Sequence, residues 1–182
     1  MIKAEQKPID EILRYLRYRT GAFFAFYKTP TEREVHVLEG VLEKPDSRGP
    51  FPAVAVCHPH PRYGGDMYNN VVSVICQALA QESIATLRFN FRGVGASQGK
   101  FSNGAGEKED AIAAISCLSS LKAVDKDRIG LCGYSFGGAV SLEVAPGDAR
   151  VKALALISPD ISTYLPLKHY TSPKLIVCGG AD

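Results

Sequence analysis

The pentapeptide GYSFG, residues 133–137, has the composition of a turn that presents a nucleophilic serine. It follows an apolar run over residues 128–132 and precedes an apolar stretch with helical spacing over residues 136–144. Glycines around a serine let a strand and a helix approach closely at a strained turn, which exposes the hydroxyl group. We therefore predict that Ser135 is the nucleophile of an acyl-transfer reaction.

A serine nucleophile also needs N–H donors for the oxyanion that forms when it attacks a carbonyl group. In this motif one donor is the backbone N–H of the next residue, here Phe136. The second donor belongs to a loop after an earlier strand, and the loop HPHPRYGG, residues 58–65, follows the apolar run 53–57. Both prolines in that loop lack an N–H, so the backbone N–H of His60 is the candidate.

Short apolar runs alternate with helix-like stretches through most of the chain. The runs cover residues 53–57, 84–89, 128–132, 151–157 and 174–178, and the helix-like stretches cover residues 67–81, 107–121 and 136–144. Continuous apolar strands separated by helices indicate a parallel sheet covered on both faces. The predicted fold class is α/β, with a doubly wound, mostly parallel sheet whose site lies at the carboxyl ends of the strands.

The N-terminal part of the chain has a different pattern. Residues 8–19 place four apolar side chains at helical spacing and predict a short amphipathic helix, whereas residues 35–42 (VHVLEGVL) predict an edge strand. We predict an N-terminal extension over residues 1–34 and an α/β domain over residues 35–182.

These motifs together resemble the α/β-hydrolase fold, and within it small hydrolases that carry an HPHP-x-x-GG loop. The resemblance covers roughly residues 35–182 and includes LRFNFRGVG (87–95), Ser97, Gly99, GAGE (104–107) with Asp110, and GYSFG. It implies a serine hydrolase that acts on a carboxylic ester or related small acyl substrate through an acyl-enzyme. It also implies a catalytic acid after a late strand, and Asp182 in LIVCGGAD (175–182) matches that position.

In that family a catalytic histidine follows the acid, whereas no histidine follows Asp182 in this sequence. The resemblance therefore implies a C-terminally truncated domain that lacks its last elements and is nearly inactive, because Ser135 has no general base. Missing strands would leave an apolar sheet edge, so we expect self-association through that edge. Chain order also permits an internal triad of Ser135, Asp160 and His169, although a solvated loop histidine is the simpler interpretation of His169.

Metal and cofactor chemistry find little support in the sequence. His58, His60 and Asp66 are residue types that hold zinc, but Arg62 occupies the place of an acid in a dinuclear H-x-H-x-D-H loop. The simpler role for His58 is to fix its loop through hydrogen bonds. The glycines over residues 93–99 do not match the spacing of a dinucleotide or phosphate loop. We predict no metal and no cofactor.

Composition excludes other classes of protein. The 21 Lys and Arg against 19 Asp and Glu give a net charge of +2 without a basic cluster, so nucleic acid is not a predicted partner. No apolar run reaches the ~18–20 residues of a membrane span, and the start of the chain is polar, so we predict no membrane contact and a cytoplasmic location. Five scattered cysteines predict buried, reduced thiols.

The functional alternatives are a non-catalytic binding module, or a peptidase or thioesterase, of the same fold.

Overall fold

The structure is a computed structural model of the chain, and it describes residues 23–28, 35–46, 48–160, 167 and 170–179. In these parts of the chain, seven strands form one sheet in the order β1-β2-β4-β3-β5-β6-β7. The strands are β1 (Phe23–Lys28), β2 (Val35–Glu43), β3 (Phe51–Cys57), β4 (Ala85–Phe89), β5 (Val124–Tyr134), β6 (Val151–Ile157) and β7 (Lys174–Val177). The described α-helices are α2 (Asn70–Gln81), α3 (Ala105–Ser120) and α4 (Phe136–Val144), with short 3-10 helices η1 (Pro61–Tyr63) and η2 (Ala145–Gly147).

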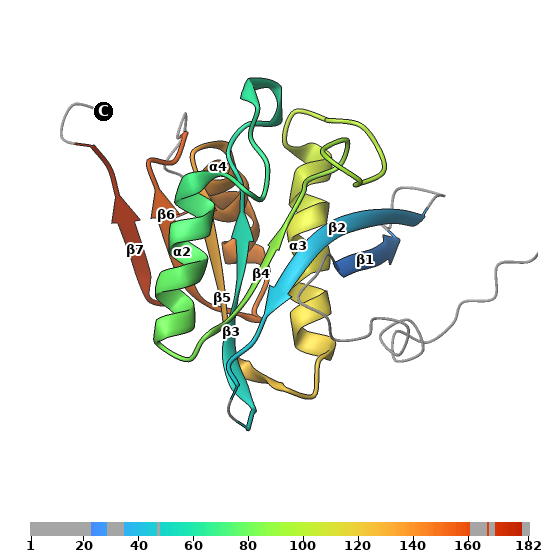
Figure 1. The fold of residues 1–182 in the computed structure, drawn as a ribbon. Coiled ribbons are helices and arrows are strands. Elements are labelled where there is room, and N and C mark those ends of the chain that lie inside the picture. The colour runs from blue at the N-terminus through green and yellow to red at the C-terminus, as the bar shows by residue number, and fades with distance from the viewer. Residues whose placement is uncertain (1–22, 29–34, 47, 161–166, 168–169, 180–182) are drawn as a thin grey trace, which may run out of the picture.

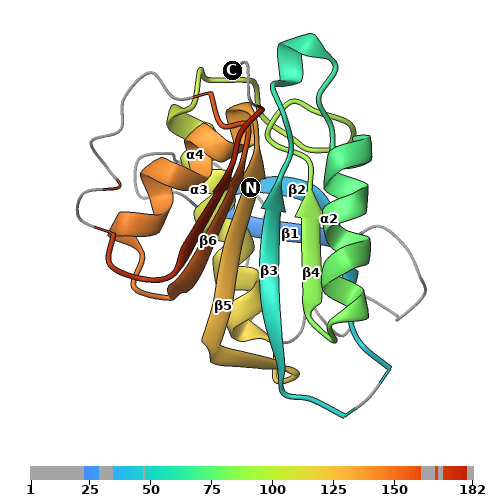
Figure 2. The same ribbon diagram turned by 90° about the vertical axis from the view of Figure 1, so that its left-hand side faces the viewer.

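Most of the sheet is parallel. Strands β4, β3, β5, β6 and β7 pair in parallel, whereas β2 is antiparallel to both β1 and β4. Helix α2 covers one face over β3 and β4, and α3 and α4 cover the other face around β5 (Figure 1 and Figure 2). The predicted α/β class, with helices on both faces of a mostly parallel sheet, is confirmed.

The sheet begins earlier in the chain than predicted. Strand β1 pairs with β2 from Phe23 opposite Gly40 to Lys28 opposite Val35. Two strands therefore flank β2, so the prediction of an edge strand there is wrong, and residues 23–28 of the predicted extension belong to the sheet. The segment FFAFYK has high β propensity, but no helix-like stretch follows it, so the βα alternation did not reveal it. The helix predicted over residues 8–19 lies outside the described residues.

The sheet divides the core into two clusters. The larger one lies between the sheet and helices α3 and α4, and it includes Leu87, Ile115 and Leu131. The smaller one lies under α2, and its buried members are Val56, Val72, Cys76 and Cys132. The strands contribute apolar side chains to both clusters, as expected for a sheet that is covered on both faces.

The cysteines differ in exposure. Cys57, Cys76 and Cys132 are buried and Cys117 is partly buried, all as free thiols. Cys178 is exposed, so the prediction of a buried thiol is wrong there, because it follows β7, the last strand of the described sheet. No helix in the described residues is long and apolar enough to cross a membrane.

Candidate active site

Ser135 lies at the sharp turn between β5 and α4. Its φ of 52° and ψ of −117° form a backbone conformation that residues other than glycine rarely adopt and that costs ~1–3 kcal/mol. The Ser135 N–H donates to the carbonyl oxygen of Ile157 at 2.9 Å, and the Ser135 carbonyl accepts from the N–H groups of Ala139 and Asp160 at 3.1 and 3.2 Å. Hydrogen bonds to neighbouring elements therefore hold the strained turn in place.

Three glycines make this turn sterically feasible. A Cβ atom at Gly133 would overlap the carbonyl oxygen of Gly137, and one at Gly137 would overlap the carbonyl oxygen of Cys57. At Gly138 a Cβ atom would lie 2.9 Å from Cβ of Pro159. Strand β5, helix α4 and the loop after β3 thus meet backbone against backbone, which is the physical reason for the glycine spacing in the motif.

His58 fixes the loop after β3. Its side chain is 0% exposed, its Nδ1–H donates to the carbonyl oxygen of Pro59 at 2.6 Å, and its Nε2 accepts the backbone N–H of Phe91 at 3.0 Å. Burial lowers the pKa of His58 to about 4, although the Pro59 hydrogen bond and the carboxylates of Asp66 and Glu107 act in the opposite direction. The ring is therefore neutral at pH 7, and both of its nitrogens are engaged within the protein. The predicted loop-fixing role is confirmed.

His60 lies beside the residue that follows the nucleophile. The ring centroids of His60 and Phe136 are 4.8 Å apart, so the two predicted oxyanion donors come from neighbouring residues. Among the hydrogen bonds of the described residues, none has the backbone N–H of His60 or Phe136 as its donor. The Nδ1 of His60 accepts the backbone N–H of Arg62 at 3.1 Å and caps η1. The oxyanion role of these two N–H groups stays a prediction.

Polar side chains tie the loop after β4 to its surroundings. The Asn90 Oδ1 accepts the backbone N–H of Met67 at 2.9 Å, and its Nδ2 donates to Glu39 Oε2 at 2.8 Å. The Ser97 hydroxyl donates to the Asn90 carbonyl oxygen at 2.7 Å and accepts the Glu39 N–H at 2.9 Å. The loop is thereby joined to β2 and to the loop after β3.

A buried ion pair joins the same loop to α3. Arg92 and Asp110 are 3% and 0% exposed, and Arg92 Nη2 lies 2.9 Å from Asp110 Oδ1. Glu107, also 0% exposed, accepts the N–H groups of Ser102 and Gly104 at 2.9 and 2.7 Å at the start of α3. These residues belong to the motifs that carry the family resemblance, and no role was predicted for them. The sequence signal for buried polar contacts was the presence of Glu107 and Asp110 among apolar residues of the helix-like stretch 107–121.

Cys57 and Cys132 lie at the ends of β3 and β5, close to the turn at Ser135. Burial raises the pKa of both thiols to about 12. Thiolates are the reactive form of cysteine, so these side chains are inert near neutral pH. They belong to the core, as predicted.

The structure describes four of the predicted site residues. Ser135, Phe136 and His60 lie together at the carboxyl ends of β3 and β5. The backbone of Asp160 contacts Ser135, but its side chain is exposed. Asp182 and His169 lie outside the described residues, so the catalytic acid and base stay predictions.

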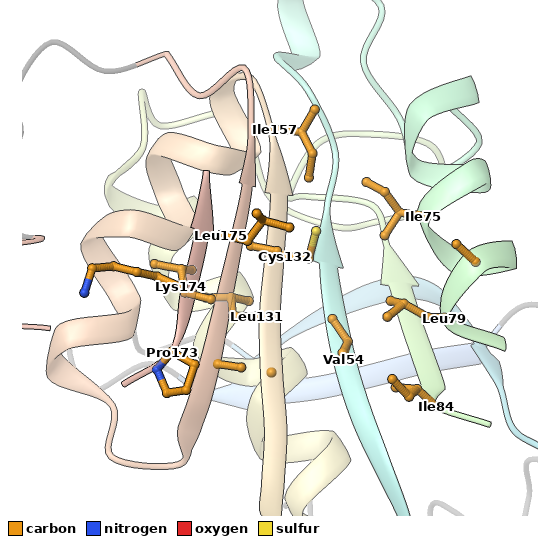
Figure 3. Close-up of a pocket in the computed structure, with 15 residues that line it drawn as sticks. Val54, Ile75, Leu79, Ile84, Leu131, Cys132, Ile157, Pro173, Lys174 and Leu175 are labelled. Carbon is orange, nitrogen blue, oxygen red and sulfur yellow. The ribbon is translucent and has the colours of Figure 1, made fainter. Parts of the chain in front are cut away.

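A separate cavity of about 530 Å³ lies on the face of the sheet that α2 covers in part (Figure 3). Apolar side chains of α2, β5 and β7 line it, including Ile75, Cys132 and Leu175. Neither Ser135 nor His60 lines this cavity. It is therefore distinct from the candidate active site.

A strained serine between a parallel strand and a helix defines a protein of the α/β-hydrolase fold. The family model described as X-Pro dipeptidyl-peptidase (S15 family) matches residues 4–174, and the chain belongs to that family. The match begins well before Val35, the predicted start of the α/β domain.

Curated relatives extend this similarity. The chain is 38% identical over 126 residues to the uncharacterized protein RP471 of Rickettsia prowazekii, which covers 69% of this chain and 52% of that protein. It is 28% identical over 116 residues to the uncharacterized protein YcjY of Escherichia coli, covering 62% of this chain and 37% of that protein. The chain spans about half the length of RP471 and less of YcjY.

Solved structures confirm the fold. Protein ATU1826 from Agrobacterium tumefaciens matches with a TM-score of 0.75 and 31% identity, covering 88% of this chain and 72% of that one. An alpha-beta serine hydrolase homologue from Coxiella burnetii matches with a TM-score of 0.72 and 35% identity over 86% and 73%. XC6422 from Xanthomonas campestris, a serine hydrolase without lid, matches with a TM-score of 0.72 and 30% identity over 91% and 74%.

Proposed function

We propose that this protein is a serine hydrolase that cleaves a carboxylic ester or related small acyl substrate, with Ser135 as the nucleophile. The observation that carries the proposal is the backbone of Ser135, whose φ is 52° and ψ is −117°. Such strain persists only where the surrounding structure enforces it, and it clusters at active sites. The similarity to serine-hydrolase structures supports the same conclusion.

In this mechanism the Ser135 hydroxyl oxygen bonds to the substrate carbonyl carbon, and the carbonyl electrons move to oxygen. The backbone N–H groups of Phe136 and His60 donate to that oxyanion, and each such donor stabilises the transition state by about 3–4 kcal/mol. The oxyanion collapses, the alcohol leaves with a proton, and the acyl group stays on Ser135. Water then hydrolyses the acyl-enzyme to the free acid and restores the hydroxyl group.

The proton relay has two candidate arrangements. In the first, Asp182 orients a histidine that this sequence does not contain, and that histidine takes the Ser135 proton and gives it to the leaving alcohol. In the second, Asp160 and His169 fill these roles within the printed sequence. Neither arrangement requires a metal or cofactor, and we propose a cytoplasmic location on the sequence alone.

Hydrolysis of p-nitrophenyl acetate tests the proposal. The first relay takes its histidine from outside this sequence, so the assay uses both this chain and a form extended beyond Asp182. We expect at least one form to release p-nitrophenol above the buffer rate, and Ser135→Ala to abolish that release. The matched control is Ser120→Ala, at the end of α3, where the hydroxyl only donates to the Cys117 carbonyl oxygen at 2.7 Å. Equal rates for Ser135→Ala and the parent protein would overturn the proposal, and a His169→Ala variant decides between the two proton relays.

A peptidase is the second candidate, because the matching family is described as X-Pro dipeptidyl-peptidase. Ala-Pro-p-nitroanilide tests it in the same assay, since cleavage after proline releases nitroaniline. Cleavage that depends on Ser135 favours the peptidase. A folded protein without Ser135-dependent turnover of either substrate favours the non-catalytic binding module.

A further inference from the structure

Aromatic side chains from two loops and from the start of α4 meet near Ser135. His60 follows β3, Phe101 follows β4 and Phe136 follows β5, and the loops after β3 and β4 project from the same end of the sheet (Figure 1). The ring centroid of His60 lies 5.0 Å from that of Phe101 and 4.8 Å from that of Phe136, and the latter two are 5.7 Å apart. These three rings and Tyr63, whose centroid lies 4.9 Å from that of His60, form what we call the aromatic shelf.

The outer end of the aromatic shelf faces solvent. Tyr63 is 88% exposed although its ring contacts His60, whereas Phe136 at the inner end is 9% exposed. The Arg62 guanidinium lies 4.8 Å from the centroid of Phe101. A single exposed tyrosine is ordinary on a protein surface. This one continues a row of rings that ends at Phe136, the residue after the nucleophile.

The turn that carries Tyr63 is rigid. The N–H groups of Tyr63 and Gly65 both donate to the His60 carbonyl oxygen at 3.1 Å. Gly64 has a φ of 76°, and a Cβ atom at Gly65 would overlap the carbonyl oxygen of Pro59. A ligand that contacts the aromatic shelf therefore does not have to order this turn, which keeps the entropic cost of binding low.

We propose that the aromatic shelf binds an aromatic ring of the substrate close to the carbonyl that Ser135 attacks, so that the preferred substrates are esters carrying an aryl group. Aromatic rings favour tilted or edge-on contacts at centroid distances of about 4.5–7 Å, which is the arrangement the shelf rings already have among themselves. The expected preference for aryl esters rests on the proposed hydrolase function. The expected binding of an aromatic ring to the aromatic shelf does not depend on it.

Two matched pairs of esters test the preference: ethyl 3-phenylpropionate against ethyl hexanoate for a ring on the acyl side, and benzyl acetate against hexyl acetate for a ring on the alcohol side. We expect kcat/KM to favour the aryl member of at least one pair, and the ratio to fall about fivefold in Tyr63→Ala. Tyr63→Phe keeps the ring and should keep the ratio. Tyr68→Ala is the control, because Tyr68 is also exposed on this loop, at 57%, and its ring faces Arg88 instead.

A binding measurement tests the aromatic shelf separately from the proposed hydrolase function. Saturation-transfer NMR with 3-phenylpropionate on Ser135→Ala should show contact with the phenyl protons, and the additional Tyr63→Ala change should weaken it. Ser135-dependent hydrolysis whose aryl-to-alkyl ratio is unchanged in Tyr63→Ala overturns the shelf. Absence of Ser135-dependent hydrolysis overturns the proposed function, and the NMR signal then decides the shelf by itself.

Discussion

The carboxyl edge of the sheet and the face between α2 and β7 are built in opposite ways. At the edge, the glycines around Ser135 let backbones touch, and the charges of Arg92 and Asp110 are buried and paired. On the face, a cavity of about 530 Å³ is lined by apolar side chains, and Leu175 on β7 is 60% exposed (Figure 3). Close packing admits one arrangement of atoms, whereas an open face tolerates many. The atoms are therefore held most closely in place at the carboxyl edge of the sheet, where we propose that the reaction takes place.

The largest expected effect is the loss of a buried charge at the edge. Asp110→Asn removes the buried carboxylate that pairs with Arg92 at 2.9 Å and leaves the more distant carboxylate of Glu109, at 3.4 Å, so we expect the free energy of unfolding to fall by about 3–5 kcal/mol. The exposed pair Lys108–Glu143, with an Nζ to Oε2 distance of 2.8 Å, provides the contrast. Glu143→Gln should cost no more than about 1 kcal/mol. Urea unfolding followed by circular dichroism measures both losses, and equal values would contradict the expected difference between the buried and the exposed ion pair.

A second test adds one methyl group at the elbow. Gly137→Ala places a Cβ atom against the backbone of the loop after β3, and we expect a loss of about 3 kcal/mol despite the better helix propensity of alanine. Gly147→Ala is the control, because nothing lies within 4 Å of a Cβ atom there. The control should change stability by less than about 1 kcal/mol. A Gly137→Ala protein as stable as the control would show that the elbow is looser than the structure indicates.

The third test uses pH. His58 has a pKa of about 4 in the folded protein against 6.5 for an unperturbed histidine, so the unfolded chain binds an extra proton between these values. Stability should therefore rise by about 3 kcal/mol from pH 4 to pH 6.5 through this group and stay level above it. His58→Gln should flatten this part of the profile. A profile unchanged by His58→Gln would contradict the burial of a neutral ring.

The smallest effect on folding is expected at β7. This strand is the last of the described sheet, and all four of its residues are exposed, so we propose that the β7 edges of two copies pair. Leu175→Lys should change the free energy of unfolding by less than about 0.5 kcal/mol and lower the dimer fraction in sedimentation velocity. Val74→Lys, at a residue of α2 that is 62% exposed and does not line the cavity, should leave association unchanged. A protein that sediments as a monomer at every concentration rules out this pairing.

Local pattern was enough to predict the strands and helices around Ser135, because contiguous apolar runs and glycine spacing are local properties. It also placed His60 and Phe136 at one site through their positions after predicted strands. Strand β1 was missed because its pairing with β2 depends on a partner across the sheet. The contacts of Asn90 with Glu39, 51 positions apart, and of Arg92 with Asp110, 18 apart, were missed for the same reason. The rings of the aromatic shelf come from two loops and the start of α4, so no single stretch of the sequence predicts it.

Covalent labelling of Ser135 tests the central claim most directly. The protein is incubated with an alkyl fluorophosphonate, and the adduct is located by peptide mapping with mass spectrometry. The account predicts one phosphonyl group per chain on Ser135, absent in Ser135→Ala and present in Ser120→Ala. A folded protein that takes up no label, or a label that persists in Ser135→Ala, would contradict it.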